Sequence, residues 1–193
     1  MRIARSLLPF ALTLLAVSGQ LACQETRRAP QSAAQEAGAR MTIRVETTAF
    51  APGGNIPAQF TCSGANISPA LRWSGVPKEA KSLALIVHDP DAPVGDFTHW
   101  LLYGVASSVS ELSENVAKSP EVAGVGRQGT NDFRKIGYGG PCPPPGKPHR
   151  YFFRVYALDT ELSLAAGADR AAVEAAMRGH VIAQGELMGK FAR

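Results

Sequence analysis

The chain has 193 residues, a formal net charge of +4 and 45% hydrophobic residues. Its Lys and Arg residues are scattered and form no cluster interleaved with aromatic residues, so we expect no nucleic-acid partner. Beyond the N-terminal leader, no stretch is apolar enough to cross a membrane.

The first 22 residues have the pattern of a secretory signal peptide. Arg2 and Arg5 precede an apolar run from Leu7 to Val17, and small residues follow it. This run has about 11 residues, whereas a spanning helix needs ~20. We therefore expect an exported protein that is periplasmic or anchored by lipid to the cell envelope.

Cys23 follows Leu21 and Ala22, which resembles the end of a bacterial lipoprotein signal, where the cysteine becomes lipidated. Gln20 departs from that pattern, because an aliphatic residue normally stands there. Two alternatives remain open. Cys23 is lipidated and tethers the protein to a membrane, or it is an unmodified cysteine beside an ordinary cleavage site.

Residues 24–40 are rich in Gln, Ala, Glu and Arg and contain no large apolar side chain. Such a composition cannot bury a core, so we expect a flexible tether over 23–41, with a short helix over 33–40 as the alternative. The remaining residues, 42–193, are enough for one domain with a hydrophobic core.

Within that domain, apolar alternation and β-branched runs predict short strands separated by turns. Residues 106–129 show no firm period and predict a long excursion with one short strand. Asp169 and Gly179 flank an alanine-rich segment that predicts a helix. We expect a mainly β fold, an antiparallel β-sandwich with one or two peripheral helices. The strands are expected over 42–47, 71–73, 82–88, 99–105 and 151–158, and 180–191 is expected to form one or two more.

A stretch rich in glycine and proline runs from Tyr138 to Tyr151. Proline fixes φ near about −65° and glycine permits positive φ, so we expect a stiff, irregular loop. Such a run is often only a surface connection. Here His149, Arg150 and Tyr151 stand at the mouth of an apolar strand, and polar groups held there favour a binding site.

Further polar groups stand at the ends of two other apolar runs. Asp89 and Asp91 follow one run and alternate with prolines, and His99 leads the next. Each feature alone is more typical of a turn or of a core residue. Strand ends gather at one edge of a sandwich, so we expect one small pocket lined by 89–93, 99–100 and 139–151.

Cys62 and Cys142 remain as a pair if Cys23 is lipidated. In an oxidising compartment we expect them to form a disulfide that holds the glycine- and proline-rich loop to the N-terminal part of the domain. The alternative is a pair of buried free cysteines.

These motifs in this order resemble the phosphatidylethanolamine-binding protein family, which includes the Raf kinase inhibitor proteins and bacterial relatives. The resemblance covers nearly all of 42–193 and implies a β-sandwich of that type with a small pocket for phosphate-like anions. It also implies a cis bond between Ala92 and Pro93. The matching stretches are 60–64, 66–69, 89–93, 99–100, 137–144, 149–151 and 156–159.

The resemblance implies that the ligand-binding positions are Asp89, Asp91, His99, Pro144, His149 and Tyr151, with Gly139 and Gly140 where the backbone approaches the anion. The candidate hydrogen-bond donors are the two histidines, the phenol and the N–H groups near the glycines. A carboxylate only accepts, so Asp89 would orient a histidine or bind the ammonium of a headgroup.

We expect a non-enzymatic binding module for phosphate or a phospholipid headgroup, without a cofactor, and with modulation or inhibition of a protein partner as a further expectation. The alternative is a hydrolase that acts on a phosphoester or a peptide through the Asp and His residues. No Gly-x-Ser-x-Gly nucleophile motif supports it. A metal site of two histidines and two aspartates is a third possibility, although the spacing matches no closed zinc pattern.

Overall fold

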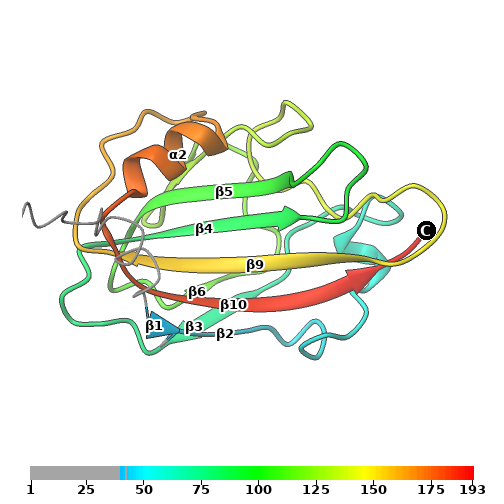
Figure 1. The fold of residues 1–193 in the computed structure, drawn as a ribbon, viewed down its shortest axis with the longest axis horizontal. Helices are drawn as coiled ribbons and strands as arrows, with labels where there is room; N and C mark the ends of the chain where they lie inside the picture. The colour runs from blue at the N-terminus through cyan, green and yellow to red at the C-terminus, as the bar shows by residue number, and fades with distance from the viewer. Residues whose placement is uncertain (1–39, 42) are drawn as a thin grey trace, which may run out of the picture. The chain divides into compact units, whose positions relative to one another are not determined.

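The computed structural model describes residues 40–41 and 43–193 (Figure 1). The predicted signal peptide over 1–22, Cys23 and nearly all of the tether over 23–41 lie outside these residues. In the described part of the chain, no helix has the length and apolarity needed to span a bilayer.

Seven strands of the described residues form one large sheet, in which β5, β4, β9 and β10 lie side by side (Figure 1). All its pairings are antiparallel except that of β1 with β10, which is parallel. The order across the sheet is β1 (Arg40–Met41), β10 (Val181–Phe191), β9 (His149–Leu158), β4 (Ser82–Asp89), β5 (Phe97–Ala106), β8 (Gly126–Gln128) and β7 (Glu121–Val122).

A smaller sheet of three strands supplies the second layer. Its side chains Val45, Leu71 and Trp73 share one hydrophobic core with the large sheet. The strands are β2 (Arg44–Glu46), β3 (Leu71–Ser74) and β6 (Glu111–Leu112), and a short 3-10 helix, η1 (Ala58–Phe60), precedes β3.

The large sheet is buried on both faces, which explains why its central strands are almost continuously apolar. On β4, Leu85 and Val87 face the core between the sheets, whereas Ile86 faces a second cluster. Helix α2 (Arg170–Met177) covers that second face with two buried apolar side chains. Asp169 caps the helix, because its carboxylate accepts a hydrogen bond from the Ala172 N–H at 2.8 Å.

The predicted mainly β sandwich is confirmed, and so are its central strands and its late helix. The prediction for 106–129 was wrong, since the structure places three short strands (β6, β7 and β8) there. Buried Gln128 holds this region in place. It accepts from Trp100 Nε1 at 2.6 Å and donates to two carbonyl groups of the preceding loop. Contacts so distant in sequence leave no local pattern.

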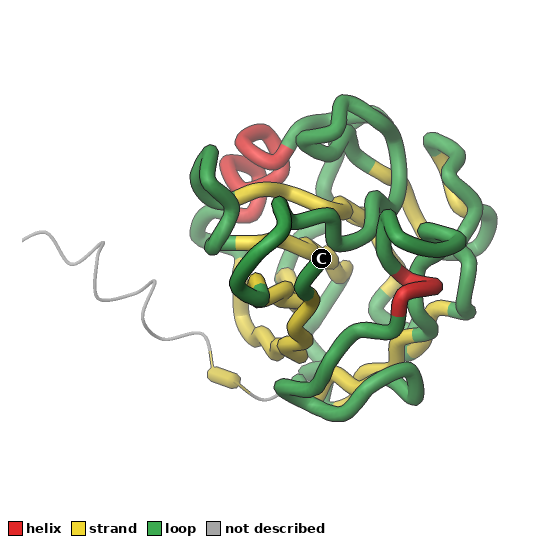
Figure 2. Tube along the Cα trace, turned by 90° about the vertical axis from the view of Figure 1, so that its right-hand side faces the viewer, coloured by secondary structure: helices red, strands yellow, loops and turns green. Residues whose placement is uncertain are grey.

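The antiparallel pairings bring three strand ends to one edge of the large sheet. Asp89, the last residue of β4, pairs with Phe97, the first of β5. His88 pairs with Phe152, so the start of β9 lies at the same edge. Figure 2 views this end of the domain directly and shows loops gathered around the C-terminal residue.

Candidate functional site

A cavity of about 160 Å³ opens at the edge where β4 ends and β5 and β9 begin. Four of the eight predicted ligand-binding residues line it: Asp89, His99, Pro144 and His149. The other lining residues are Ala92, Pro93, Val94, Phe97, Phe133, Cys142 and Pro143. The predicted convergence of three polar segments is therefore present, although not every predicted residue reaches the cavity.

Asp89 orients His149 at the base of this pocket. Its carboxylate lies 2.8 Å from His149 Nδ1, and the side chains are only 4% and 12% exposed. The other carboxylate oxygen accepts from the backbone N–H of Asp91 at 2.8 Å. Because the carboxylate only accepts, Nδ1 carries the hydrogen, and Nε2 is the imidazole nitrogen left for a ligand.

His99 is held in the same manner by a backbone carbonyl. Its Nδ1 donates to Gly139 O at 2.7 Å, which again leaves Nε2 for a ligand. The ring packs edge-on against Tyr151 and Phe133, with ring centroids 5.2 and 5.4 Å away. Burial lowers the pKa of His99 below the ordinary value of 6.5, so in the free protein the imidazole is neutral at pH 7 and Nε2 is an acceptor.

The glycine- and proline-rich loop forms one wall, and the disulfide between Cys62 and Cys142 predicted from the sequence is confirmed. The Cα atoms of the two cysteines are 5.3 Å apart, and Cys142 lines the cavity. The Cys62 N–H also donates to Pro141 O at 3.0 Å. The wall is therefore joined to the segment after η1 by a covalent bond and a backbone hydrogen bond.

The N–H groups of Gly139 and Gly140 themselves already have hydrogen-bond partners within the protein, so donors from the backbone near them stay a prediction. The Gly139 N–H donates to His99 O at 2.9 Å, and the Gly140 N–H donates to the Asn66 side chain at 2.7 Å. Close packing explains why both residues are glycine. A Cβ atom would come within 2.6 Å of the Phe133 ring at Gly139 and would collide with Phe60 O at Gly140.

Asp91 and Tyr151 do not belong to the lining of the cavity. Arg150 forms two side-chain hydrogen bonds with the Asp91 carboxylate, at 2.8 and 2.7 Å, and lowers the pKa of this group to about 2. The Tyr151 hydroxyl is buried and has no partner of hydrogen-bonding geometry among the described residues. Burial and the nearby Asp89 carboxylate raise the pKa of Tyr151, so it remains a neutral phenol.

Comparison with known proteins places this architecture in a family. The model of the phosphatidylethanolamine-binding protein family matches residues 46–192. The chain belongs to the phosphatidylethanolamine-binding protein family. A UPF0098 protein of Aquifex aeolicus is 48% identical over 153 residues, which are 78% of this chain and 89% of the relative. A UPF0098 protein of Methanothermobacter thermautotrophicus is 49% identical over 151 residues, covering 78% and 99% of the two chains.

Two crystal structures of phosphatidylethanolamine-binding protein relatives are similar to this chain. The CT736 homologue from Chlamydia trachomatis has a TM-score of 0.72 at 41% identity and covers 79% of this chain and 99% of its own. E. coli YbcL, described as a member of the mammalian family, has a TM-score of 0.71 at 31% identity and the same coverage. These likenesses agree with the two-sheet fold.

The cis bond that the family resemblance implied between Ala92 and Pro93 is absent, because every peptide bond among the described residues is trans. The turn closes without it, since the Gly95 N–H donates to Ala92 O at 2.9 Å. No three His, Cys, Asp or Glu side chains of the described residues are grouped closely enough to hold a metal ion.

An apolar rim that was not predicted from the sequence borders the cavity, and it is formed by Val94, Phe97 and Phe133. Val94 is 82% exposed and Phe133 is 38% exposed. The Phe97 ring lies 5.2 Å from His99 and 4.8 Å from Phe133. Phe97 stands two positions before His99, and side chains two apart share one face of a strand, so this member could have been inferred. Phe133 lies between Asp132 and Arg134 in a loop, where no pattern marks it.

A second buried histidine stands on the opposite face of the sheet from the cavity. His88 precedes Asp89 on β4, and successive side chains of a strand point to opposite faces. Its Nδ1 contacts Asp96, and its Nε2 is buried without a partner among the described residues. Burial lowers the pKa of His88 below the ordinary 6.5.

Proposed function

We propose that the chain is a non-enzymatic binding protein whose pocket at Asp89, His99 and His149 takes a phosphate-like group, either as a free anion or as the headgroup of a larger molecule. One observation carries this proposal. Two histidines line one cavity, and each is fixed through Nδ1 so that Nε2 is left for a ligand. Such pre-oriented groups lose little entropy on binding.

Proton uptake supplies the donors that an anion needs. A neutral imidazole presents only a lone pair at Nε2, whereas an imidazolium donates. A nearby anion favours the charged form of an imidazole, so a bound anion would stabilise the imidazolium of His99. Anion binding at neutral pH is therefore coupled to protonation, and affinity falls as pH rises.

The size of the cavity favours a small group. At about 160 Å³ it is well below the ~300–1,000 Å³ of pockets that enclose drug-sized ligands. It suits a phosphate with a few further atoms, and the exposed Val94 and Phe133 would then contact whatever the anion is attached to. A partner protein that the ligand or the rim recruits is part of the same proposal.

We also propose that the protein works outside the cytoplasm, either in the periplasm or tethered to the cell envelope through Cys23. The disulfide between Cys62 and Cys142 supports an oxidising compartment. Mass spectrometry of the N-terminal peptide checks the tether. A lipid mass on Cys23, absent from a Cys23→Ala variant, supports it, and an unmodified Cys23 in mature protein contradicts it.

Calorimetric titration of inorganic phosphate and of phosphoethanolamine at pH 6 tests the pocket. We expect saturable binding that weakens about tenfold or more in His99→Ala and in His149→Ala, because each loses a charge-assisted hydrogen bond worth ~1.5–3 kcal/mol. His180→Ala is the matched control, since His180 is exposed and bonded to Asp159 away from the cavity. Equal binding by all three variants, or none by the wild type, contradicts the proposal.

The wild type and the His149→Ala variant also distinguish a binding module from the alternative hydrolase. Release of phosphate from a panel of phosphoesters, or cleavage of a peptide panel, that disappears in His149→Ala would establish an enzyme. Saturable binding without turnover supports the binding module.

A further inference from the structure

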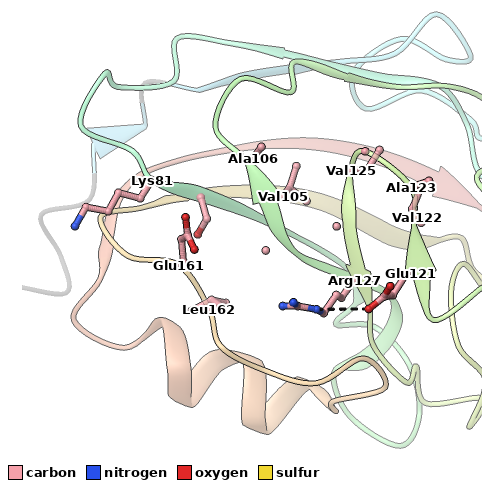
Figure 3. Close-up of a pocket in the computed structure, with 14 residues that line it drawn as sticks. Lys81, Val105, Ala106, Glu121, Val122, Ala123, Val125, Arg127, Glu161 and Leu162 are labelled. Atoms are coloured by element: carbon pink, nitrogen blue, oxygen red, sulfur yellow. Dashed lines mark ion pairs between the residues drawn. The ribbon is translucent and has the colours of Figure 1, made fainter.

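A second, larger cavity lies at the other end of β4 and β5, away from the histidine pocket (Figure 3). It measures about 420 Å³ and is lined by the start of β4, by Gly104–Ala106 at the end of β5, and by the β7–β8 hairpin. An adjoining cavity of about 480 Å³ shares Glu121, Arg127, Glu161 and Leu162 with it. We call the two together the hairpin groove.

The groove exists because β5 extends beyond the residues that pair with β8. The β5–β8 ladder pairs only Leu102 with Gln128 and Tyr103 with Arg127, whereas β5 continues to Ala106. Gly104 has a φ of +61°, and a Cβ atom there would lie 3.8 Å from the Arg127 guanidinium. The glycine therefore permits the positive φ at this position, and a Cβ atom there would make only an ordinary contact with Arg127.

Two opposite charges face each other across this space. Figure 3 shows Glu161 on one side and the Arg127 side chain extended toward it from the other, while the Lys81 amino group points away. Arg127 Nη1 reaches Leu164 O at 3.4 Å, and Nε is 3.9 Å from Glu121. Most of its five N–H donors therefore remain for a ligand.

Glu161 has no ion-pair partner within 4.0 Å among the described residues. The groove lining also includes the half-buried apolar side chains Val122 and Val125 of the hairpin. The groove thus offers the Arg127 guanidinium, with the loosely paired Glu121 beside it, the Glu161 carboxylate, unpaired among the described residues, on the other side, and apolar side chains in its lining.

We propose that the hairpin groove binds a short zwitterionic ligand, whose carboxylate pairs with Arg127 and whose ammonium pairs with Glu161. A planar guanidinium can hold a carboxylate through two parallel hydrogen bonds. A simple anion would be repelled by Glu161 and a simple cation by Arg127, so only a ligand with both charges is attracted at both sides. The apolar wall suits small apolar substituents such as those of alanine. This proposal is independent of the function proposed for the histidine pocket.

A free amino acid and a short peptide share this chemistry, and a length series separates them. Amide chemical shifts of the purified protein are followed by NMR during titration with alanine, dialanine and trialanine. We expect saturable shifts of the Gly104, Gly124 and Gly126 amides with at least one of them, and the tightest binder gives the ligand length.

End-blocked probes and matched variants test the two charges. Acetylation of the best probe, which removes its ammonium, and amidation, which removes its carboxylate, should each weaken binding at least tenfold. Arg127→Gln and Glu161→Gln should do the same. The control Arg72→Gln alters an exposed ion pair with Glu111 on another strand and should leave binding unchanged. Lack of saturation with all three probes, or equal binding of the blocked probes, would overturn the proposal.

Discussion

The two ends of strands β4 and β5 hold their polar groups in contrasting ways. At the histidine pocket, Asp89 and His149 are 4% and 12% exposed and are bonded to each other. At the hairpin groove, Arg127 and Glu121 are 44% and 74% exposed, and their closest approach is 3.9 Å. A buried charge must be paired, whereas an exposed one is solvated without a partner.

This difference separates two kinds of binding site. The groups of the histidine pocket keep one geometry before any ligand arrives, and they contribute to the stability of the fold. The groups of the hairpin groove can move to meet a ligand and should contribute little to stability. Substitutions at the two ends should therefore differ in their effect on unfolding.

The largest effect is expected from the disulfide that anchors the pocket wall. Cys62 and Cys142 are 80 residues apart in sequence, and opening a loop of that length should lower the free energy of unfolding by about 4 kcal/mol. Urea unfolding of the Cys62→Ser, Cys142→Ser double variant measures it. The wild type treated with a reductant should match the variant. A loss below about 1 kcal/mol would mean that the wall is held by other contacts.

The second-largest effect is expected from acid, which should lower the free energy of unfolding. His88 and His99 are neutral in the folded protein because burial lowers their pKa, but each gains a proton near pH 6.5 when unfolded. Below pH 6.5 the unfolded state therefore binds more protons than the folded state. The stability that the two neutral histidines contribute is fully present above pH 6.5 and is lost as pH falls. Between pH 7.5 and 5.5 the free energy of unfolding should drop by up to about 3 kcal/mol.

Urea unfolding at several pH values checks this slope in the absence of phosphate and sulfate. His99→Gln should remove roughly half of it. A free energy of unfolding that stays constant from pH 7.5 to 5.5 would show that neither histidine is kept neutral by the fold.

Matched substitutions at the histidine pocket and at the hairpin groove should have smaller and unequal effects on the free energy of unfolding. Asp89→Asn places an amide where a carboxylate accepts hydrogen bonds from His149 and from the Asp91 N–H. One of these donors should lose its acceptor, at a cost of about 2 kcal/mol. Glu161→Gln, the matched change in the groove, should alter the free energy of unfolding by less than about 0.5 kcal/mol. Equal losses in the two variants would remove the distinction between the ends.

Much of the fold follows from local sequence. The apolar runs of β4, β5 and β9 predict buried strands, and Asp169 marks the start of α2. The pocket could be located because its polar residues stand at the ends of those strands, which antiparallel pairing brings to one edge. The disulfide could be inferred from the number of cysteines and the expected compartment.

Other features depend on contacts that no local pattern encodes. Gln128 organises 106–129 through hydrogen bonds to Trp100 and to two carbonyl groups, so only one of the three short strands there was predicted. The internal partners of the Gly139 and Gly140 N–H groups could not be predicted, because His99 O and the Asn66 side chain lie 40 or more residues away in sequence. Phe133 enters the rim through a loop with no periodicity.

Sulfate binding as a function of pH tests the central claim most directly, because sulfate is a phosphate-like anion that stays fully ionised between pH 5.5 and 7.5. Any pH dependence then comes from the protein. Calorimetry in two buffers of different ionisation enthalpy counts the protons that bind with it. We expect proton uptake at pH 7 and a Kd that rises with pH, by at most about tenfold per unit for each proton. No binding, or binding with a constant Kd and no proton uptake, would contradict an anion pocket built on His99 and His149.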